Sequence, residues 1–285
     1  MEEAQRRKMG YILLLPAVII TLVVKYFPLL YSLYITLIQD GSFAFDNYLR
    51  QMLSSDFHNA IKNTLVFALG EAMGSTILGL GVALVLNESF RGREGVRTVC
   101  FLPWIVPYVI AGIIFRWMLH PLGGIIPGFL ARIGLNPNCF MLSRFDSAMR
   151  GVLLAGIWRG FPFAAIMLLA GLQGIDNQLY EAARIDGANS LKILRNVILP
   201  LMFPTVMIVV LLRFIWATGQ FDIIHIMTGG GPLRATETVP LFIHRLAFRL
   251  FDFPSSATTS VIYFVLVFLF CLPYIILSAR QLGKS

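Results

Sequence analysis

The chain has 285 residues, of which 57% are hydrophobic and only 13% are charged, and its mean hydropathy is +0.76. This composition exceeds the apolar share of a soluble globular domain, so the sequence predicts a membrane protein. The formal net charge of +8 does not indicate a nucleic-acid-binding protein, because the basic residues lie mostly at the ends of apolar runs and no basic soluble segment accompanies them.

Six apolar runs follow one another along the chain. A hydrocarbon core about 30 Å thick needs roughly 20 helical residues, because each residue rises about 1.5 Å. Only helices satisfy their own backbone in lipid at such lengths, and a transmembrane β-barrel would show shorter alternating segments. We therefore expect an all-α membrane protein with six transmembrane helices in a single transmembrane domain, 1–285. The predicted crossings are 10–38, 59–87, 98–119, 149–172, 197–221 and 258–279.

The first run is longer than a crossing requires. Basic residues at 6–8 precede it, as in a signal peptide, but no small-residue cleavage site follows, so we expect a retained first helix. Pro28 offers a kink. Lys25 lies near the middle of the run, where it either faces protein or a cavity, or extends its amine to the interface at a break before Pro28.

The distribution of Lys and Arg favours an orientation with both termini inside. Inner segments then carry eleven basic residues: Arg6, Arg7, Lys8, Arg91, Arg93, Arg97, Arg184, Lys192, Arg195, Arg280 and Lys284. The outer segments are longer in total and carry six: Arg50, Arg132, Arg144, Arg234, Arg245 and Arg249.

The connection between the fourth and fifth crossings, 173–196, is the most informative inner segment. Residues 181–186 have helix-forming composition, Gly187 permits a sharp change of direction, and Leu191, Ile193 and Leu194 give an apolar face to a second short helix. We expect two short helices joined by a bend at Gly187, which together can serve as a lever.

This connection resembles the EAA loop of ATP-binding-cassette (ABC) importer permeases, whose pattern is EAA, three residues, Gly, nine residues, then Ile-x-Leu-Pro. Glu181, Ala182, Ala183 and Gly187 stand at the matching spacing, and 197–200 closes the pattern with Val in the Ile position. The resemblance implies a coupling loop that docks on a separate ATPase. It assigns that contact to Glu181, Ala182, Ala183, Asp186 and Gly187. A bare EAA triplet in an ordinary capped helix is the alternative, which the Gly offset and the Leu-Pro closure disfavour.

A second resemblance narrows the class to the carbohydrate-uptake permeases, a group with maltose, oligosaccharide and glycerol-phosphate importers. The residues that carry it are Tyr26–Ser32, Leu102–Trp104, Trp158, Pro162, Phe221–Ile223, Thr228–Pro232, Thr236 and Thr238. It implies a type I ABC importer transmembrane domain in the bacterial cytoplasmic (inner) membrane. The implied partners are a second, non-identical permease, two copies of a nucleotide-binding ATPase and an extracytoplasmic solute-binding protein that docks on outer loops including 120–147 and 223–257.

The sequence contains no GxxxxGK[ST] loop to hold the phosphates of ATP, so the chain itself is not expected to be an enzyme. ATP and Mg²⁺ would bind the partner ATPase, and no cofactor or metal is expected here. Cys100, Cys139 and Cys271 are widely separated and indicate packing. The four histidines show neither metal-ligand spacing nor a catalytic arrangement.

Ionisable residues inside crossings are costly in lipid, which makes them candidates for a solute pathway. The candidate pathway residues are Asn63, Glu71, Trp158, Arg159, Arg213, Gln220 and Asp222. Facing a common cavity, the charged ones could bind sugar hydroxyls or an anionic group, with Trp158 stacking on a sugar ring. A structural alternative stays open, in which Glu71 pairs with an arginine and the arginines stabilise helix contacts. For Asp222, a cap or turn role is favoured over solute binding.

Two other functions compete with the importer. An ion-driven secondary transporter or channel would use the intramembrane charges as an ion relay, but it leaves the EAA loop unexplained. A membrane scaffold has little reason to carry such charges at all. Co-purification of an ATPase distinguishes the importer from both.

Overall fold

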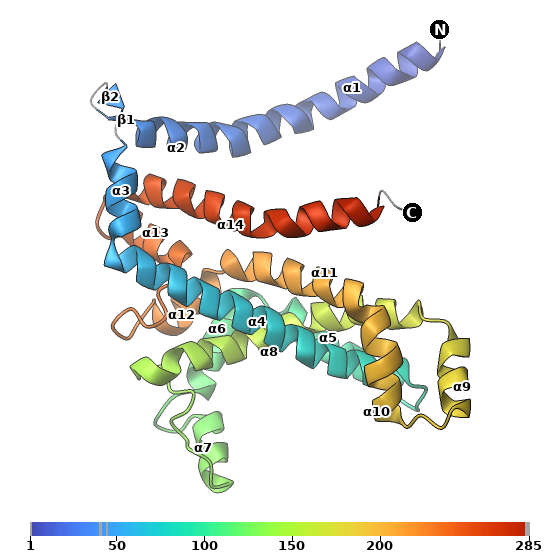
Figure 1. Cartoon of the computed structure of the whole chain (residues 1–285). Helices are drawn as coiled ribbons and strands as arrows, with labels where there is room; N and C mark the ends of the chain where they lie inside the picture. The colour runs from blue at the N-terminus through green and yellow to red at the C-terminus, as the bar shows by residue number, and fades with distance from the viewer. Residues whose placement is uncertain (1, 40–41, 44, 283–285) are drawn as a thin grey trace. The chain divides into compact units, whose positions relative to one another are not determined.

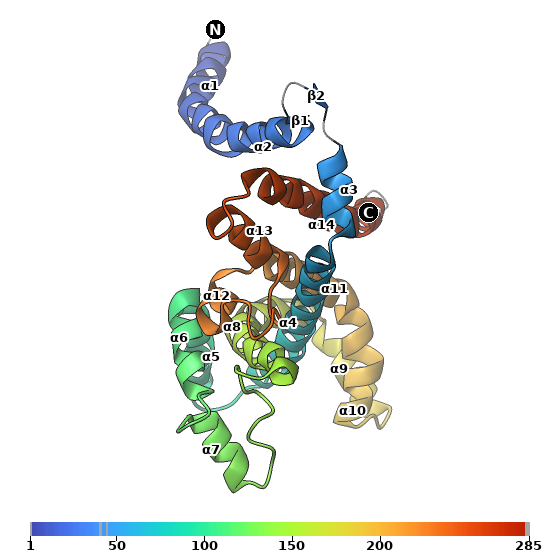
Figure 2. The same ribbon diagram turned by 90° about the vertical axis from the view of Figure 1, so that its left-hand side faces the viewer.

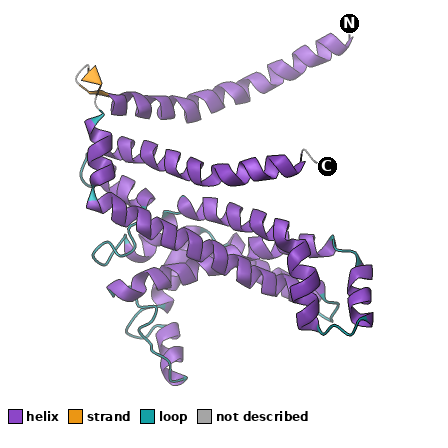
Figure 3. Cartoon of the chain, in the orientation of Figure 1, coloured by secondary structure: helices purple, strands orange, loops and turns teal. Residues whose placement is uncertain are grey.

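The computed structural model describes residues 2–39, 42–43 and 45–282, and this part of the chain is almost entirely helical (Figures 1 and 3). The exception is a pair of two-residue antiparallel strands, β1 (Ile38–Gln39) and β2 (Ser42–Phe43), in which Ile38 pairs with Phe43. The all-α prediction is therefore confirmed apart from this short ladder. Lys284, one of the basic residues that favour the orientation, lies outside the described residues.

The helices follow one another in the order α1 (Glu2–Thr21), the π-helical turn η1 (Leu22–Tyr26), α2 (Phe27–Leu37), α3 (Asp46–Leu53), α4 (Ser55–Asn87), α5 (Arg93–Ile105), α6 (Tyr108–Met118), α7 (Ile125–Arg132), α8 (Phe145–Gln173), α9 (Asn177–Ile185), α10 (Ser190–Ile193), the π-helical turn η2 (Leu194–Ile198), α11 (Leu199–Thr218), α12 (Asp222–Thr228), α13 (Val239–Phe248) and α14 (Phe253–Leu282). Helix α13 is a short apolar helix that precedes the last predicted crossing.

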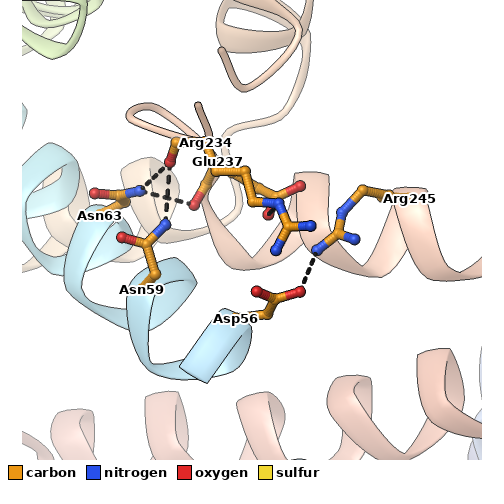
Figure 4. A network of polar contacts seen from close by, with 6 residues as sticks. All are labelled: Asp56, Asn59, Asn63, Arg234, Glu237 and Arg245. Carbon is orange, nitrogen blue, oxygen red and sulfur yellow. Dashed lines mark hydrogen bonds and ion pairs between the residues drawn. The ribbon is translucent and has the colours of Figure 1, made fainter. Parts of the chain in front are cut away.

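The chain forms two compact units, one of residues up to 58 and from 243 onward, the other of residues 59–242. In the first unit α2 and α3 both pack on α14 (Figures 1 and 2). A hydrogen bond of 2.7 Å between the hydroxyls of Thr36 and Tyr48 joins α2 to α3. Arg245 of α13 pairs with Asp56 at the start of α4 at 3.1 Å (Figure 4).

The first span runs over Leu13–Leu37 and contains η1. Pro28 has no N–H to donate to the carbonyl of Val24, and its ring crowds that carbonyl, which the wider π-turn accommodates. The predicted irregularity therefore occurs one turn before the proline. Lys25 lies in this turn with its side chain exposed on the surface of the first unit.

Helix α8 is the central helix of the second unit, where α5, α6, α11 and α12 all pack on it. Of its most apolar 18-residue window 56% is buried, the largest share among the candidate spans. Two buried clusters mark the two ends of this unit. One includes Phe115, Leu119 and Val152, and the other includes Leu86 and Leu172.

The third predicted crossing, 98–119, is not one straight helix. Helices α5 and α6 meet at an angle of 97° across Val106 and Pro107. Pro107 lacks an N–H and forces the preceding Val106 into an extended conformation, with ψ 124°, which ends α5. The described residues therefore contain five candidate spans, or six if the bent pair crosses as one.

Helices α9 and α10 lie together at one end of the second unit, opposite α6 and α12 (Figures 1 and 2). The side chain of Asp176 caps α9 by accepting from the Gln178 N–H at 3.0 Å, and Asn189 caps α10 by accepting from the Lys192 N–H at 2.9 Å. Helix α10 continues through η2 into α11. This segment corresponds to the predicted pair of short helices.

Candidate functional site

The bend between α9 and α10 is a Schellman turn. The Ala188 N–H donates to the carbonyl of Ala183 at 2.9 Å, and the Gly187 N–H donates to that of Arg184 at 3.0 Å. Gly187 has φ +75°, a left-handed conformation that costs other residues energy. Ala183, the last alanine of the EAA triplet, is the third-last residue of α9, and Gly187 is the left-handed residue of the turn. The geometry of this turn therefore explains why the glycine stands four residues after that alanine.

The coupling residues differ in burial. Glu181, Ala182, Asp186 and Gly187 are exposed, whereas Ala183 packs against the buried cluster that contains Leu172. Four of the five residues assigned to the ATPase contact thus lie on the free side of the loop. The fifth, Ala183, lies on the side of α9 that faces the rest of the second unit.

Two exposed apolar side chains lie on the same loop and are not among the five residues that the resemblance assigns to the ATPase contact. Ile185 is 86% exposed and Leu191 is 71% exposed. Leu191 was expected on an apolar face together with Ile193, but only Ile193 is buried. The signal for Ile185 was its position two residues after Ala183, because positions two apart on a helix do not share a face.

Tyr180 anchors α9 on its opposite side. Its ring packs against the cluster that contains Leu172, and its hydroxyl is buried. Burial raises the pKa of Tyr180, and the nearby negative charge of Glu88 raises it further. The phenol is therefore neutral at physiological pH, which suits a side chain that holds the loop by packing.

A buried ion pair joins α4 to α11 across the middle of α8. Arg213 Nη2 donates to Glu71 Oε1, and the two side chains are 5% and 2% exposed. The pair passes directly over Gly160, where an added Cβ would lie 2.8 Å from Arg213 Cζ. Gly156 lies one turn earlier on α8, and a Cβ added to it would be 3.2 Å from Glu71 Cγ. Two glycines on one face of α8 thus make room for the charged pair.

A small cavity adjoins this ion pair. It provides about 10 Å³ for the centre of a water-sized sphere, roughly enough for one water molecule. Its walls are formed by Phe67, Glu71, Tyr108, Gly156, Arg213, Trp216, Ala217, Gln220 and Ile223. Glu71 Oε2 and Arg213 Nε find no hydrogen-bond partner among the residues that the structure describes. Three candidate pathway residues, Glu71, Arg213 and Gln220, therefore meet at one cavity.

Two other candidates lie on α8 beside this cavity. Trp158 packs its ring 5.3 Å from that of Phe115. Arg159 Nε donates to the carbonyl of Val106 at 3.0 Å, and its guanidinium lies 4.0 Å from the ring centroid of Tyr108. Neither residue forms part of the cavity wall, although Arg159 contacts Tyr108, which does.

Asn63 takes part in a backbone-binding network at the start of α4 (Figure 4). Its Nδ2 donates to the carbonyl oxygens of Arg234 at 3.0 Å and Glu237 at 3.2 Å, and Asn59 donates to Arg234 at 3.1 Å. These bonds order the Gly-rich segment after α12. Asp222 is exposed in the first turn of α12, where a carboxylate stabilises the helix N-terminus.

No group of three or more His, Cys, Asp or Glu side chains that could hold a metal ion occurs within the described ranges. The candidate features of the second unit are the exposed loop of α9 and α10 at one end and the buried Glu71–Arg213 ion pair in the middle of its helices.

A family model described as "Binding-protein-dependent transport system inner membrane component" matches residues 75–281, which contain the coupling loop and most of the helical bundle. The chain belongs to this family. The resemblance to ABC importer permeases is thereby confirmed, and the permease is the membrane component of its transport system rather than the ATPase.

Individual relatives cover nearly the whole permease. It is 34% identical over 275 residues to the trehalose/maltose transport system permease protein MalF of Thermococcus litoralis, covering 94% of this chain and 92% of that one. It is 32% identical to the sulfoquinovosyl glycerol transport system permease protein SmoG of Agrobacterium fabrum, covering 91% and 87%. It is 31% identical to the sn-glycerol-3-phosphate transport system permease protein UgpA of Rhizobium meliloti, covering 90% of each chain.

The solved structures agree on the fold. The permease matches a chain of the bacterial alginate ABC transporter, in complex with an alginate-pentasaccharide-bound periplasmic protein, with a TM-score of 0.83 at 24% identity, covering 98% and 97% of the two chains. Family and fold together identify the permease subunit of an ABC importer and leave no support for the ion-driven secondary transporter or the scaffold.

Proposed function

We propose that this permease passes a carbohydrate or a related polyol or sugar derivative into the cytoplasm, driven by ATP hydrolysis on a separate subunit. The relatives named above carry trehalose/maltose, sulfoquinovosyl glycerol and sn-glycerol-3-phosphate in their names, all hydroxyl-rich solutes. The observation that carries the coupling mechanism is the exposed Schellman turn of α9 and α10, with its glycine at φ +75°.

The coupling loop is the proposed contact with the ATPase, which binds ATP and Mg²⁺. Glu181 and Asp186 offer carboxylates to basic groups of the partner, while Ala182 and Gly187 allow close approach. We add Ile185 to this contact, because an apolar side chain that is 86% exposed gains stability when a partner covers it.

The proposed assembly contains a second, non-identical permease, two ATPase subunits and an extracytoplasmic solute-binding protein. In the bacterial cytoplasmic membrane, both termini of this chain face inward, and α5 and α6 together make the third of six crossings. The Lys and Arg distribution supports this orientation, since the coupling loop then lies on the side where ATP is available.

The proposed solute pathway includes the cavity wall at Glu71, Arg213 and Gln220. Polar groups surrounded by aromatic rings suit a hydroxylated solute, because the rings stack on a sugar face while the polar groups bind hydroxyls. A cavity of about 10 Å³ holds no sugar in this conformation. The proposal therefore requires α4, α8 or α11 to move when the permease changes state.

The test of coupling compares two glycines that the fold makes equivalent. Gly134, after α7, also has φ +75°, and it closes the same turn, with Leu135 donating to Leu130 at 2.9 Å and Gly134 donating to Ala131 at 3.2 Å. Gly187→Pro should abolish solute-stimulated ATP hydrolysis in the complex purified through this chain, since proline cannot adopt the turn. Gly134→Pro introduces the same defect on the opposite side.

Loss of stimulation in Gly187→Pro, with the complex still assembled and the binding protein still bound, supports coupling through this loop. Because Gly134 lies in the proposed docking surface 120–147, a loss in Gly134→Pro should come with weaker binding of the binding protein. Unchanged stimulation in Gly187→Pro contradicts the coupling proposal. Maltose, trehalose and sn-glycerol 3-phosphate, each with the cognate binding protein, serve as solute probes. Stimulation by none of them, when ATPase co-purifies, would reject this solute class and leave the coupling proposal standing.

A further inference from the structure

The break in the third span leaves a backbone carbonyl that its own helix cannot satisfy. The helical ladder of α6 resumes with the Ala111 N–H donating to the Pro107 carbonyl at 2.9 Å, so the Val106 carbonyl has no helical donor. Arg159, in the middle of α8, donates its Nε–H to this carbonyl at 3.0 Å. At membrane depth such a bond matters, because an irregular backbone is tolerated there only when protein groups satisfy it.

The same guanidinium also holds the other side of the break. Its Cζ lies 4.0 Å from the centroid of the Tyr108 ring, close enough for a cation–π interaction. Arg159 therefore contacts the residue before Pro107 through an N–H and the residue after it through the position of its guanidinium over the Tyr108 ring. Arginine suits this double contact, since its planar group donates in the plane and stacks above it, whereas the ammonium of lysine is a point charge.

Neighbours of Arg159 on α8 contact both helices that flank the break, α5 and α6. The ring of Phe163 lies 6.1 Å from that of Trp104 in α5, and the ring of Trp158 lies 5.3 Å from that of Phe115 in α6. One stretch of α8 thus contacts both helices and the break between them. Arg159 is the only one of these three α8 side chains for which the structure gives a hydrogen bond to the break itself.

We propose that Arg159 is a positioning residue that fixes the bend of the third span against α8 and holds Tyr108 in the cavity wall. It acts through Val106 and Tyr108 and binds no solute by its charge. The inference rests on the proposed function only in giving the cavity a role in transport. The contacts themselves can be tested without ATP or solute.

The experiment is a double-mutant cycle in the complex purified through this chain. Arg159→Met and Tyr108→Leu are made singly and together, with Tyr108→Phe as the control that keeps the ring. The first readout is the unfolding temperature of the complex. The second is the rate at which a water-soluble maleimide labels Val106→Cys, a position chosen because its hydrogen bond uses the backbone carbonyl and survives the substitution.

We expect Arg159→Met and Tyr108→Leu each to raise the labelling rate by roughly tenfold, as expected if one charged hydrogen bond or cation–π contact is lost. The double variant should add little to Arg159→Met, because Arg159→Met already removes the cation–π contact that Tyr108→Leu removes, together with the hydrogen bond to Val106. Tyr108→Phe should keep the wild-type rate and unfolding temperature. Arg159→Lys should recover only part of them.

Additive effects of Arg159→Met and Tyr108→Leu would overturn the inference, and so would full recovery by Arg159→Lys, which would point to charge alone. If Arg159→Met fails to assemble, the comparison of Tyr108→Leu with Tyr108→Phe decides: different labelling rates support the bend contact and equal rates reject it. None of these outcomes depends on ATPase co-purification, so failure here is distinguishable from failure of the proposed function.

Discussion

Glu71 and Arg213 lie inside spans where either charge alone would be costly. Because each side chain is at most 5% exposed, the mutual attraction of the two charges mainly offsets the hydration free energy that they lose on burial. Such a pair adds little net stability but makes each partner depend on the other.

This dependence predicts that Glu71→Ala lowers the free energy of unfolding by about 3–5 kcal/mol, because it leaves the Arg213 charge buried and unpaired. Combining Glu71→Met with Arg213→Met should recover most of that loss, since no charge remains to be buried. Thermal unfolding of the purified complex in detergent measures both. A double variant as unstable as Glu71→Ala would show that the pair contributes more than its charges require.

Gly160 provides a second prediction at the residue scale. Gly160→Ala places a methyl group 2.8 Å from Arg213 Cζ and must displace the ion pair, which we expect to cost about 1–3 kcal/mol, as overpacking typically does. Gly81→Ala in α4 is the matched control, because nothing lies within 4 Å of its Cβ position. Comparable unfolding temperatures for the two variants would contradict the packing described around α8.

At the scale of elements, the coupling loop and the bent span differ in how far sequence alone could predict them. The spacing from Ala183 to Gly187 is set by local turn geometry, so the sequence predicted the bend at the right residue. The break between α5 and α6 is different. Pro103 lies within α5 without ending it, while Pro107 ends it, and the two prolines look alike in sequence. What distinguishes them includes the donor from Arg159, more than 50 residues away.

The coupling loop also carries a prediction about partner binding. Ile185→Ser should weaken co-purification of the ATPase, because burying this side chain would contribute about 1.5–3 kcal/mol to docking. Leu122→Ser is the matched control, since Leu122 is 87% exposed and Ile185 86%, but it lies in the turn after α6. Pull-down of the ATPase through each variant provides the measurement. Equal recovery from both would remove Ile185 from the contact.

At the scale of the whole molecule, the predicted crossings overlap the five candidate spans and the bent pair α5–α6, but the sequence could not pair the charges within them. Glu71, Arg159 and Arg213 lie on three different helices, and which of them meet depends on how those helices pack around Gly156 and Gly160. The structure pairs Glu71 with Arg213 and gives Arg159 a backbone partner. The structure therefore contains the structural pair that the sequence left open, and it places Glu71 and Arg213, but not Arg159, in the wall of one small cavity.

The proposed orientation predicts opposite labelling of two exposed positions. In sealed right-side-out vesicles of a Cys139→Ser background, a membrane-impermeant maleimide should label Leu122→Cys at once. It should label Ile185→Cys only after the vesicles are permeabilised. Both side chains are more than 85% exposed, so accessibility within the chain does not limit either reaction. The reverse pattern would place the coupling loop outside and reject the inward termini.

The π-turn η2 lies between the coupling loop and α11. A π-turn holds one residue more than an α-helical turn over about the same rotation, and each residue of an α-helix turns the chain by about 100°. Deleting a single residue within 194–198 should therefore let the helix run on regularly and keep the EAA residues facing nearly the same way. Deleting a residue from the regular part of α11 instead would rotate them around the α11 axis by about 100°, so η2 is a segment in which the chain can change its length without turning the loop.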